Sequence, residues 1–247
     1  MSTYKTYMPC MLLRPYVDAY WTVRSGLLPG PSQRILPDGC VDIICNLGND
    51  VFTSSGDTRM AHGMVYLVGT MTHYAESFPE PESYLAGIRF KPGAFPLFFR
   101  FPLHEATDNC LEFERSLLEA VGLIRGPELA EVLDRYLLKK LQPATVPILP
   151  VIEDIVRQQG NVKIDKLATT HYITRRQLER YFKLHTGVSP KEFANIVRFC
   201  AVMPDLRKRA AHESLADIAY QFGYYDHAHL ANEIKRYTGI VPSDLRR

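Results

Sequence analysis

The sequence contains no long apolar run, and its cysteines do not fall into pairs. No stretch of about 18 apolar residues occurs, so no segment is predicted to span a membrane. The N-terminal MSTYKTYMPC lacks a basic segment followed by an apolar one, which argues against a signal peptide. Five cysteines, an odd number with no CxxC pair, argue against a disulfide framework. These absences predict a soluble protein of the reducing cytoplasm, without a membrane partner.

The sequence also has little net charge, but its two halves differ in sign. The formal net charge is +2 over 247 residues. Residues 1–147 hold 13 basic and 16 acidic residues, a balance of −3, whereas residues 148–247 hold 16 and 11, a balance of +5. This distribution fits a basic, nucleic-acid-binding domain fused to another domain, although uneven scatter of surface charge would produce it too.

The segment from residue 214 to residue 242 has the pattern of a helix-turn-helix. Apolar residues at i, i+3, i+4 and i+7 predict a short helix, which Gly223 ends. Asp226 is placed to cap a second helix by accepting a backbone N–H. The inward stripe of that helix is predicted to be Leu230, Ile234 and Tyr237. Five polar residues are expected to lie largely off it, on a face that could enter a major groove: His227, His229, Asn232, Glu233 and Arg236.

The same pattern occurs once more upstream, in residues 164–190. The leucine, glycine and proline that mark the second helix and its end recur with a constant offset of 52, whereas the helix before the turn is offset by 51. The second turn is therefore one residue longer. Two such units joined by a helical stretch are far more specific than one. The matched pairs are Leu178 and Leu230, Gly187 and Gly239, and Pro190 and Pro242.

In this arrangement, and in the segments IAYQFGY and AHLANEIKRYTGIVPSDLR, the C-terminal part of the chain resembles the AraC/XylS transcription regulators. The resemblance implies seven short helices, with two recognition helices that enter adjacent major-groove segments on one face of the DNA. The segments PYVDAYW, RILPDGCVDII and GIRFKPGAF resemble the β-barrel sensor domain of one AraC-type subgroup. That second resemblance implies an effector-binding role without naming the effector.

The N-terminal region is predicted to form short strands separated by turns. Residues 14–21 could form a short helix or a packed segment, and the apolar residues 94–101 are expected to be buried. Many short strands suggest a small barrel or a sandwich. The predicted fold class is α+β, with an N-terminal small β-barrel carrying helices and a C-terminal all-α domain with two helix-turn-helix motifs. The expected strands are Val41–Leu47, Val51–Ser54, Val65–Gly69 and Tyr84–Phe90.

Two amphipathic helices, Leu111–Leu123 and Pro127–Leu141, are expected between the strands and the basic domain. In related regulators such helices often carry the dimer contact, but they could equally pack on the strands. The segment QPATVP after them lacks periodicity, as a linker would. We expect a β-rich effector-binding domain at 1–110, a helical hairpin at 111–142, a linker at 143–147 and a DNA-binding domain at 148–247.

The first recognition helix, expected from Thr174 to His185, turns basic and polar residues outward. Arg176, Glu179 and Arg180 match base-facing positions of the family, since arginine can bond guanine bidentately and glutamate can accept from cytosine. Glu179 also precedes Lys183 by four residues, so the two could make only a helix-surface pair. Ser189 could equally cap a helix. The candidate phosphate contacts are Arg175, Lys183, Ser189, Lys235 and Arg236.

The second recognition helix matches the family less well. The family usually has arginine at position 232 and phenylalanine at position 234, so Asn232 can bond adenine but lacks a charge-assisted contact. Its grip on DNA is therefore expected to be weaker. Pro204, in the helix that joins the two units, predicts a kink or an early break. The candidate base-reading residues of this unit are His227, Ala228, His229 and Asn232.

Polar side chains of the N-terminal domain are candidate effector contacts, although turn chemistry and solvation would explain each one singly. They are Trp21, Arg34, Asp38, Asp42 and Arg89. An alternative is a constitutive regulator, or one controlled by a protein partner, whose N-terminal domain is purely structural. A remote alternative is an enzyme, but His62, His73 and Glu76 lack the spacing of a metal site. The cysteines likewise lack the context of an alkyl acceptor.

We therefore expect a sequence-specific regulator of transcription that is not an enzyme and uses neither a cofactor nor a metal. Its partners would be double-stranded promoter DNA, a small-molecule effector and a second copy of the chain. RNA polymerase would be a further partner if the protein is an activator.

Overall fold

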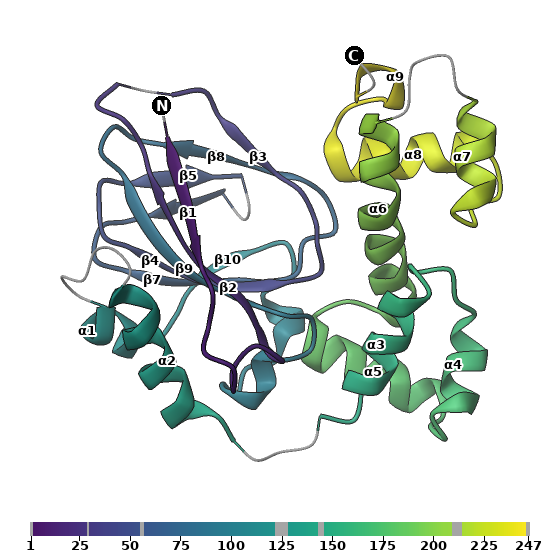
Figure 1. Ribbon diagram of the computed structural model, residues 1–247, viewed down its shortest axis with the longest axis horizontal. Helices are drawn as coiled ribbons and strands as arrows, with labels where there is room; N and C mark the ends of the chain where they lie inside the picture. Colours follow the sequence, from purple (N-terminus) through teal and green to yellow (C-terminus); the bar gives the residue numbers. More distant parts are fainter. Residues whose placement is uncertain are drawn as a thin grey trace.

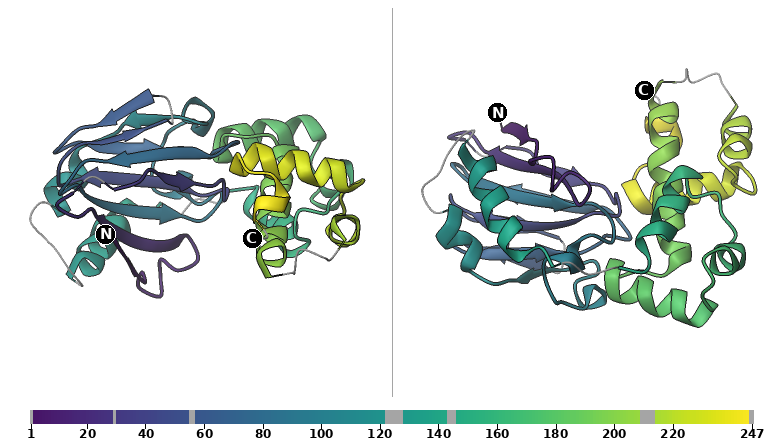
Figure 2. Two further views of the ribbon diagram at one scale, coloured as in Figure 1. Left: turned by 90° about the horizontal axis from the view of Figure 1, so that it is seen from above. Right: turned by 60° about the horizontal axis from the view of Figure 1, so that its bottom comes forward.

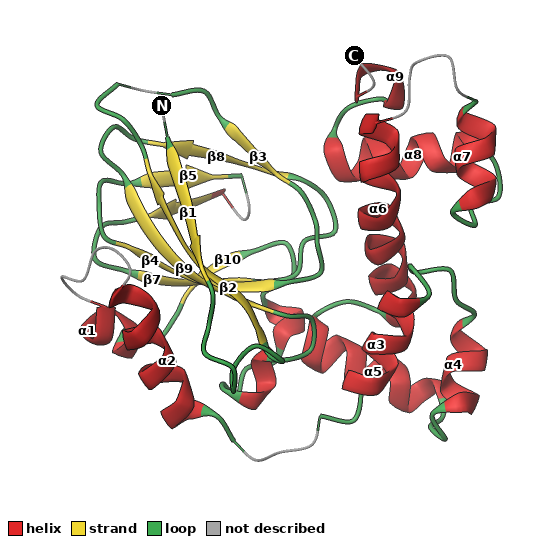
Figure 3. Cartoon of the chain, in the orientation of Figure 1, coloured by secondary structure: helices red, strands yellow, loops and turns green. Residues whose placement is uncertain are grey.

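The chain folds into a β-rich N-terminal region and a helical C-terminal region, which lie side by side (Figures 1 and 3). Both are seen in a computed structural model. Helices α1 and α2 belong to the N-terminal region, and α3 to α9 form the C-terminal region. The structure describes residues 2–28, 30–54, 57–121, 128–142, 146–208 and 214–245.

The N-terminal region is built from two antiparallel sheets. The larger has the order β1-β2-β9-β4-β7-β10, and the smaller has the order β3-β8-β5-β6. In the larger sheet the strands are, in that order, Thr3–Tyr7, Val17–Arg24, Tyr84–Phe90, Val41–Asn46, Val65–Val68 and Cys110–Glu112. In the smaller sheet they are Gln33–Ile35, Ala75–Pro79, Val51–Thr53 and Thr58–Met60.

Strand β4 lies in the middle of the larger sheet and is buried on both faces. All six of its residues are buried. Because side chains alternate along a strand, Ile43 and Cys45 join the main core, whereas Ile44 packs with Val51 and Met60 of the smaller sheet. The larger sheet is therefore covered by the smaller sheet on one face and by helices on the other (Figure 2).

The two sheets do not close, so the prediction of a barrel is wrong and the sandwich alternative holds. Among the described residues, neighbouring edges of the sheets are joined by side chains and not by a backbone ladder. Thr58 Oγ1 donates to the Cys110 carbonyl at 3.0 Å, and Gln33 Nε2 donates to Ser2 Oγ at 2.8 Å. Strands β3 and β6 are three residues long, which leaves too little ladder to close a barrel.

All four predicted strands are present, with ends within one residue of the prediction. Residues 14–21 do not form a helix, because Val17–Arg24 is strand β2 and pairs with both β1 and β9. The apolar segment 94–101 is largely buried, as predicted, and includes the short 3₁₀ helix Phe95–Leu97.

Helices α1 (Ser116–Val121) and α2 (Glu128–Lys140) pack on the larger sheet. The predicted helix 111–123 begins late, because residues 110–112 pair with β7 as strand β10; residues 122 and 123 lie outside the described residues, as does Pro127. The leucine stripe of α2 is buried in the chain's own core, and Asp134 accepts a hydrogen bond from Tyr20 Oη at 2.7 Å. The hairpin thus packs on the strands, and a dimer contact through it stays a prediction.

The C-terminal region has seven helices in residues 146–208 and 214–245, the number implied by the resemblance. Helix α6 runs between one group of helices that includes α5 and another that includes α8 (Figures 1 and 2). Of the predicted linker, residues 143–145 lie outside the described residues, and Val146 is buried in the main core. The helices are Leu149–Arg157, Ile164–Thr170, Arg175–Thr186, Pro190–Lys208, Leu215–Gln221, His227–Thr238 and Pro242–Leu245.

None of the helices in the described part of the chain has the length and apolar character needed to cross a membrane. The predicted domain limits at 110, 142 and 147 remain predictions, and strand β10 spans the first of them.

Candidate nucleic-acid interface

Two helix-turn-helix units repeat in the C-terminal region with the offsets that the sequence predicts. Helices α5 and α8 have 12 residues each and begin 52 positions apart, whereas α4 and α7 have seven residues each and begin 51 apart. The additional residue therefore lies in the turn before α8. Leu178 and Phe182 in α5, and Leu230 and Ile234 in α8, are fully buried, so both helices expose the opposite face.

Side-chain bonds determine where each recognition helix begins. In α5, Thr174 Oγ1 accepts from the Gln177 N–H at 3.2 Å and Gln177 Oε1 accepts from the Thr174 N–H at 2.9 Å, which completes a capping box. In α8, Asp226 accepts from the His229 N–H at 2.7 Å, so the predicted cap is confirmed. Each cap satisfies a backbone donor that the helix leaves free.

The two recognition helices also end alike, at a threonine followed by a glycine. The hydroxyls of Thr186 and Thr238 donate to the carbonyl four residues back, at 2.8 and 2.7 Å, and accept from the N–H two residues on. Gly187 and Gly239 then take positive φ values of 87° and 70°, which favour glycine. The repeated Thr-Gly-x-x-Pro sequence is thus a helix stop that the chain uses twice.

On α5, the predicted base-reading residues Arg176 and Arg180 are exposed, and Glu179 is half-buried. Arg175 pairs with Asp165 of α4 at 3.1 Å and approaches Glu179 to 4.0 Å. The helix-surface pair of Glu179 therefore forms with Arg175 and not with Lys183. The exposed face of α5 is strongly basic, since Lys183 is exposed beside these arginines.

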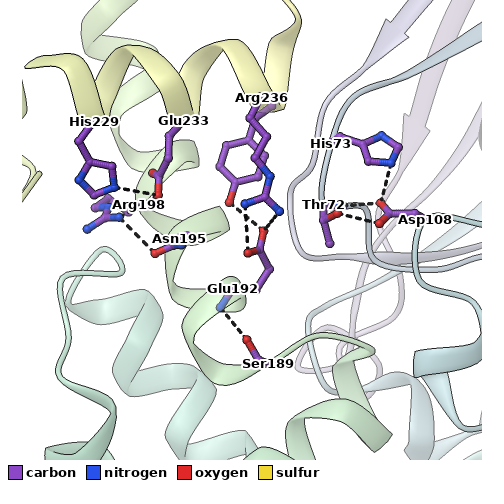
Figure 4. A network of polar contacts seen from close by, with 11 residues as sticks. Thr72, His73, Asp108, Ser189, Glu192, Asn195, Arg198, His229, Glu233 and Arg236 are labelled. Atoms are coloured by element: carbon purple, nitrogen blue, oxygen red, sulfur yellow. Dashed lines mark hydrogen bonds and ion pairs between the residues drawn. The ribbon is translucent and has the colours of Figure 1, made fainter.

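On α8, His227, Ala228, Asn232 and Lys235 are exposed, and His229 is half-buried. Arg236 is held by Glu192 of α6 through two bonds of 2.7 and 3.3 Å, so a phosphate contact would have to break this pair (Figure 4). The N–H of Glu192 in turn donates to Ser189 Oγ at 3.1 Å, which places Ser189 as a cap of α6. The roles of all these residues on DNA remain predictions.

Glu233 does not lie on the outer face of α8, which corrects the sequence prediction. Its carboxylate accepts from Arg198 of α6 at 3.0 Å, and both side chains are buried (Figure 4). The Arg198 guanidinium also lies 4.2 Å from the ring centroid of Tyr224 and donates to the Gly223 carbonyl at 3.3 Å. The signal was available, because Glu233 follows Leu230 by three residues and so shares its face.

Helix α6 is not broken at Pro204. It runs continuously from Pro190 to Lys208, so the predicted early break is wrong. Buried side chains on both sides of the proline, Val202, Met203 and Leu206, hold the helix against the second unit. Tertiary packing thus compensates for the backbone hydrogen bond that a proline cannot make.

The N-terminal region contacts the ends of both recognition helices. Thr107 Oγ1 donates to the Gly187 carbonyl at 2.9 Å, and Arg34 Nη1 donates to the Thr238 carbonyl at 2.7 Å. A Cβ on Gly239 would lie 2.6 Å from the ring of Tyr74, so this contact is close. Both copies of the Thr-Gly motif therefore serve as docking points for the β-rich region.

A cavity of about 210 Å³ lies between the two sheets. Four of the five predicted effector contacts line it: Trp21, Asp38, Asp42 and Arg89. Arg34 does not; besides Thr238 it contacts Glu76, at 3.2 Å. The rest of the lining is mostly apolar and includes Val23, Ile44, Met60, Val68 and Leu85.

The polar end of the cavity is a connected set of side chains. Trp21 Nε1 donates to Asp42 Oδ1 at 2.7 Å, and its ring covers Gly87, where a Cβ would lie 2.2 Å from the ring. Arg89 lies 3.3 Å from Asp38 and 3.4 Å from Asp42. Burial raises the pKa of Asp42 to about 6, and the neighbouring Arg89 opposes this shift.

The segment from residue 34 to residue 40 lies between this cavity and the C-terminal helices. Ile35, Asp38 and Cys40 line the cavity. Leu36 packs against the apolar core of the second unit, and the Pro37 carbonyl accepts from Cys200 of α6 at 3.5 Å. Successive residues of one short segment thus contact the cavity and the DNA-binding region.

Within the described ranges, no group of three or more histidine, cysteine or acidic side chains could hold a metal. His73 lies 3.6 Å from Asp108, and Glu76 pairs with Arg34. His62, His73 and Glu76, the candidate ligands of a metal enzyme, therefore form no such group within the described ranges.

Two capped helix-turn-helix units on one connecting helix, beside a β-rich region that encloses a cavity, define a DNA-binding regulator with a separate N-terminal module. Comparison with protein families agrees. A family described as a helix-turn-helix domain matches residues 167–247, and a family described as a domain of unknown function (DUF6597) matches residues 5–112. Over its C-terminal region the chain is thus similar to AraC-type helix-turn-helix transcription regulators.

Curated relatives include two activators. The chain is 26% identical over 134 residues to the HTH-type transcriptional activator RhaS of Enterobacter sp., covering 54% of this chain and 45% of that protein. It is 33% identical over 86 residues to RhaS of Escherichia coli, covering 35% and 30%. The chain thus matches less than half the length of these relatives. A structure of ToxT K231A from Vibrio cholerae shares the fold, with a TM-score of 0.51, 12% identity and coverage of 91% and 96%.

Proposed function

We propose that the chain is a sequence-specific transcription regulator whose DNA binding responds to a small molecule held between the two sheets. The observation that carries the proposal is the segment from residue 34 to residue 40. It lines the cavity with Ile35, Asp38 and Cys40, and it contacts the second helix-turn-helix unit through Arg34 and Leu36. A ligand that shifts this segment would therefore change its contacts with the second helix-turn-helix unit.

The first recognition helix would supply most of the grip on DNA. Arg176, Arg180 and Lys183 are exposed on α5, whereas α8 exposes one lysine, Lys235, and engages Arg236 in a pair with Glu192. Arginine can read guanine through two hydrogen bonds in the major groove, and lysine can position the helix on phosphates. Asn232 would add a contact to adenine from the second unit.

The RhaS relatives are described as activators, which favours activation and RNA polymerase as a partner. A second copy of the chain remains a proposed partner. The competing function is a constitutive regulator, or one controlled by a protein. A cavity lined by two aromatic rings, two carboxylates and a guanidinium favours a small molecule, because such a mixture of apolar lining and convergent polar groups is typical of ligand sites.

The test of DNA reading is binding of the full chain to its own upstream region and to random DNA, at two salt concentrations. Arg176→Ala and Arg180→Ala are each expected to lower the ratio of specific to random binding by about 1–3 kcal/mol. Arg157→Ala is the matched control, since Arg157 is an exposed arginine of α3, outside the recognition helices. Equal binding of all DNA by all variants, with affinity that follows salt alone, would leave these arginines as phosphate contacts at most.

A further inference from the structure

The cavity between the sheets carries an excess of negative charge in a mostly apolar lining. Its charged side chains are Arg89, Asp38 and Asp42, and the single guanidinium lies between the two carboxylates at 3.3 and 3.4 Å. One positive charge thus faces two negative ones. Asp42 is buried and shares Arg89 with Asp38, so its charge is only partly compensated, and a further cation in the cavity would be favoured.

Two aromatic rings adjoin this acidic end. Tyr4 and Trp21 both line the cavity, with ring centroids 6.3 Å apart and planes at 28°. The Trp21 ring is held in place by its hydrogen bond to Asp42 and by packing against Gly87, which has no side chain. Aromatic faces attract organic cations, and the attraction strengthens where water is excluded. The acidic pair and the rings therefore favour the same kind of ligand.

We propose that the effector cavity takes a small organic cation of the amine class, with its ammonium group at Asp42 and Asp38 and its apolar body among Ile44, Met60 and Leu85. This assignment rests on the proposed function, since it names the ligand class of the same site. A carboxylate ligand would have to displace one of the two acids from Arg89. A neutral apolar ligand would leave the buried charge as it is.

The protonation of Asp42 links this binding to pH. The groups that face its carboxylate are Arg89 of β9, Trp21 of β2, Tyr4 of β1, and Asp38 and Cys40 of the preceding loop. Burial raises the Asp42 pKa to about 6 in the free protein. At pH 5 about one Asp42 in ten remains ionised, so a cation would bind about tenfold more weakly there than at pH 8.

The experiment uses the full chain and its single tryptophan, Trp21, which reports on the cavity by its own fluorescence. The probes are n-hexylammonium, hexan-1-ol and hexanoate, which share one alkyl chain and differ in charge. At pH 8, hexylammonium is expected to change the emission saturably, hexan-1-ol to bind at least about tenfold more weakly, and hexanoate to give no saturable change. The hexylammonium affinity is expected to fall about tenfold at pH 5.

Asp42→Asn is expected to abolish the hexylammonium response while keeping the acceptor for Trp21. Asp50→Asn is the matched control, since Asp50 pairs with Arg59 outside the cavity lining, and it should respond like the wild type. If Asp42→Asn fails to fold, the comparison of the three probes on the wild type decides alone.

Equal or tighter binding of hexanoate or hexan-1-ol would overturn the cationic class and leave the cavity as an effector site. The inference would also be overturned if none of the three probes changed the Trp21 emission. The DNA-binding measurement, which uses no small molecule, decides the regulator function independently.

Discussion

The buried pair of Arg198 and Glu233 holds the second recognition helix against the connecting helix α6, and removing either partner is expected to loosen α8. The side chains are 6% and 8% exposed and lie 3.0 Å apart. Glu233→Ala would leave a buried guanidinium without its carboxylate, in contact with the Gly223 carbonyl, Asn195 and the Tyr224 ring. Breaking a buried pair by removing one partner costs about 3–5 kcal/mol, because the remaining charge is uncompensated.

The cost of each substitution is measured as the change in the free energy of unfolding, with urea unfolding of the full chain monitored by circular dichroism. Glu233→Ala and Arg198→Ala are each expected to lower the free energy of unfolding of the C-terminal region by about 3–5 kcal/mol. Asp165→Ala is the control, since Asp165 forms an exposed pair with Arg175 and should cost less than about 1 kcal/mol. The double variant Arg198→Met with Glu233→Leu removes both charges and is expected to cost less than either alanine variant.

When the same alanine variants bind DNA, the footprint over the segment contacted by α8 should weaken more than the footprint over the segment contacted by α5. The reasoning would be refuted if Glu233→Ala cost no more than the exposed control Asp165→Ala. It would also be refuted if the double variant were less stable than both single variants, because the buried charges would then not be the source of the cost.

Two further predictions concern a buried acid and a proline. Because burial raises the Asp42 pKa from 3.8 to about 6, the folded chain keeps a proton that the unfolded chain releases. Stability should therefore fall by roughly 2 kcal/mol as the pH rises from about 4 to about 6, and by roughly 3 kcal/mol over the whole range from about pH 3 to about pH 7. Asp42→Asn should remove this slope in urea unfolding at several pH values, and an unchanged slope would contradict the assignment. Pro204→Ala should restore a backbone donor within α6 and raise the melting temperature, with a gain of up to about 3 kcal/mol; a loss of stability would show that the helix is adapted to the proline.

The recognition helices could be predicted almost residue by residue because their signals are local. Asp226 caps α8 through the N–H three residues later, and the Thr238 hydroxyl bonds the carbonyl four residues back. Such contacts depend only on nearby residues, and the cap by Asp226 could therefore be predicted from the sequence. Of the kink or early break predicted at Pro204, the early break does not occur, because the effect of the proline depends on the packing of α6 against the second unit.

The strands were predicted less completely than the helices. The runs that become β4 and β9 are mostly apolar and were found, whereas part of β2 was predicted as a short helix or a packed segment. Its conformation depends on pairing with β1 and β9, which come from distant parts of the chain. A barrel and a sandwich can be built from the same short strands. They differ only in whether the edge strands of the two sheets pair through backbone hydrogen bonds.

The sequence by itself determined the resemblance to AraC-type regulators, the two helix-turn-helix units and the buried stripes of their recognition helices, since periodicity and capping act over a few residues. Only the tertiary structure decided that Asp38, Asp42 and Arg89 meet in one cavity and that Arg34 instead contacts Thr238, 204 positions away. It also placed Thr107 on Gly187, 80 positions away. Contacts across such separations follow from how the sheets and helices pack, and no local pattern in the chain encodes them.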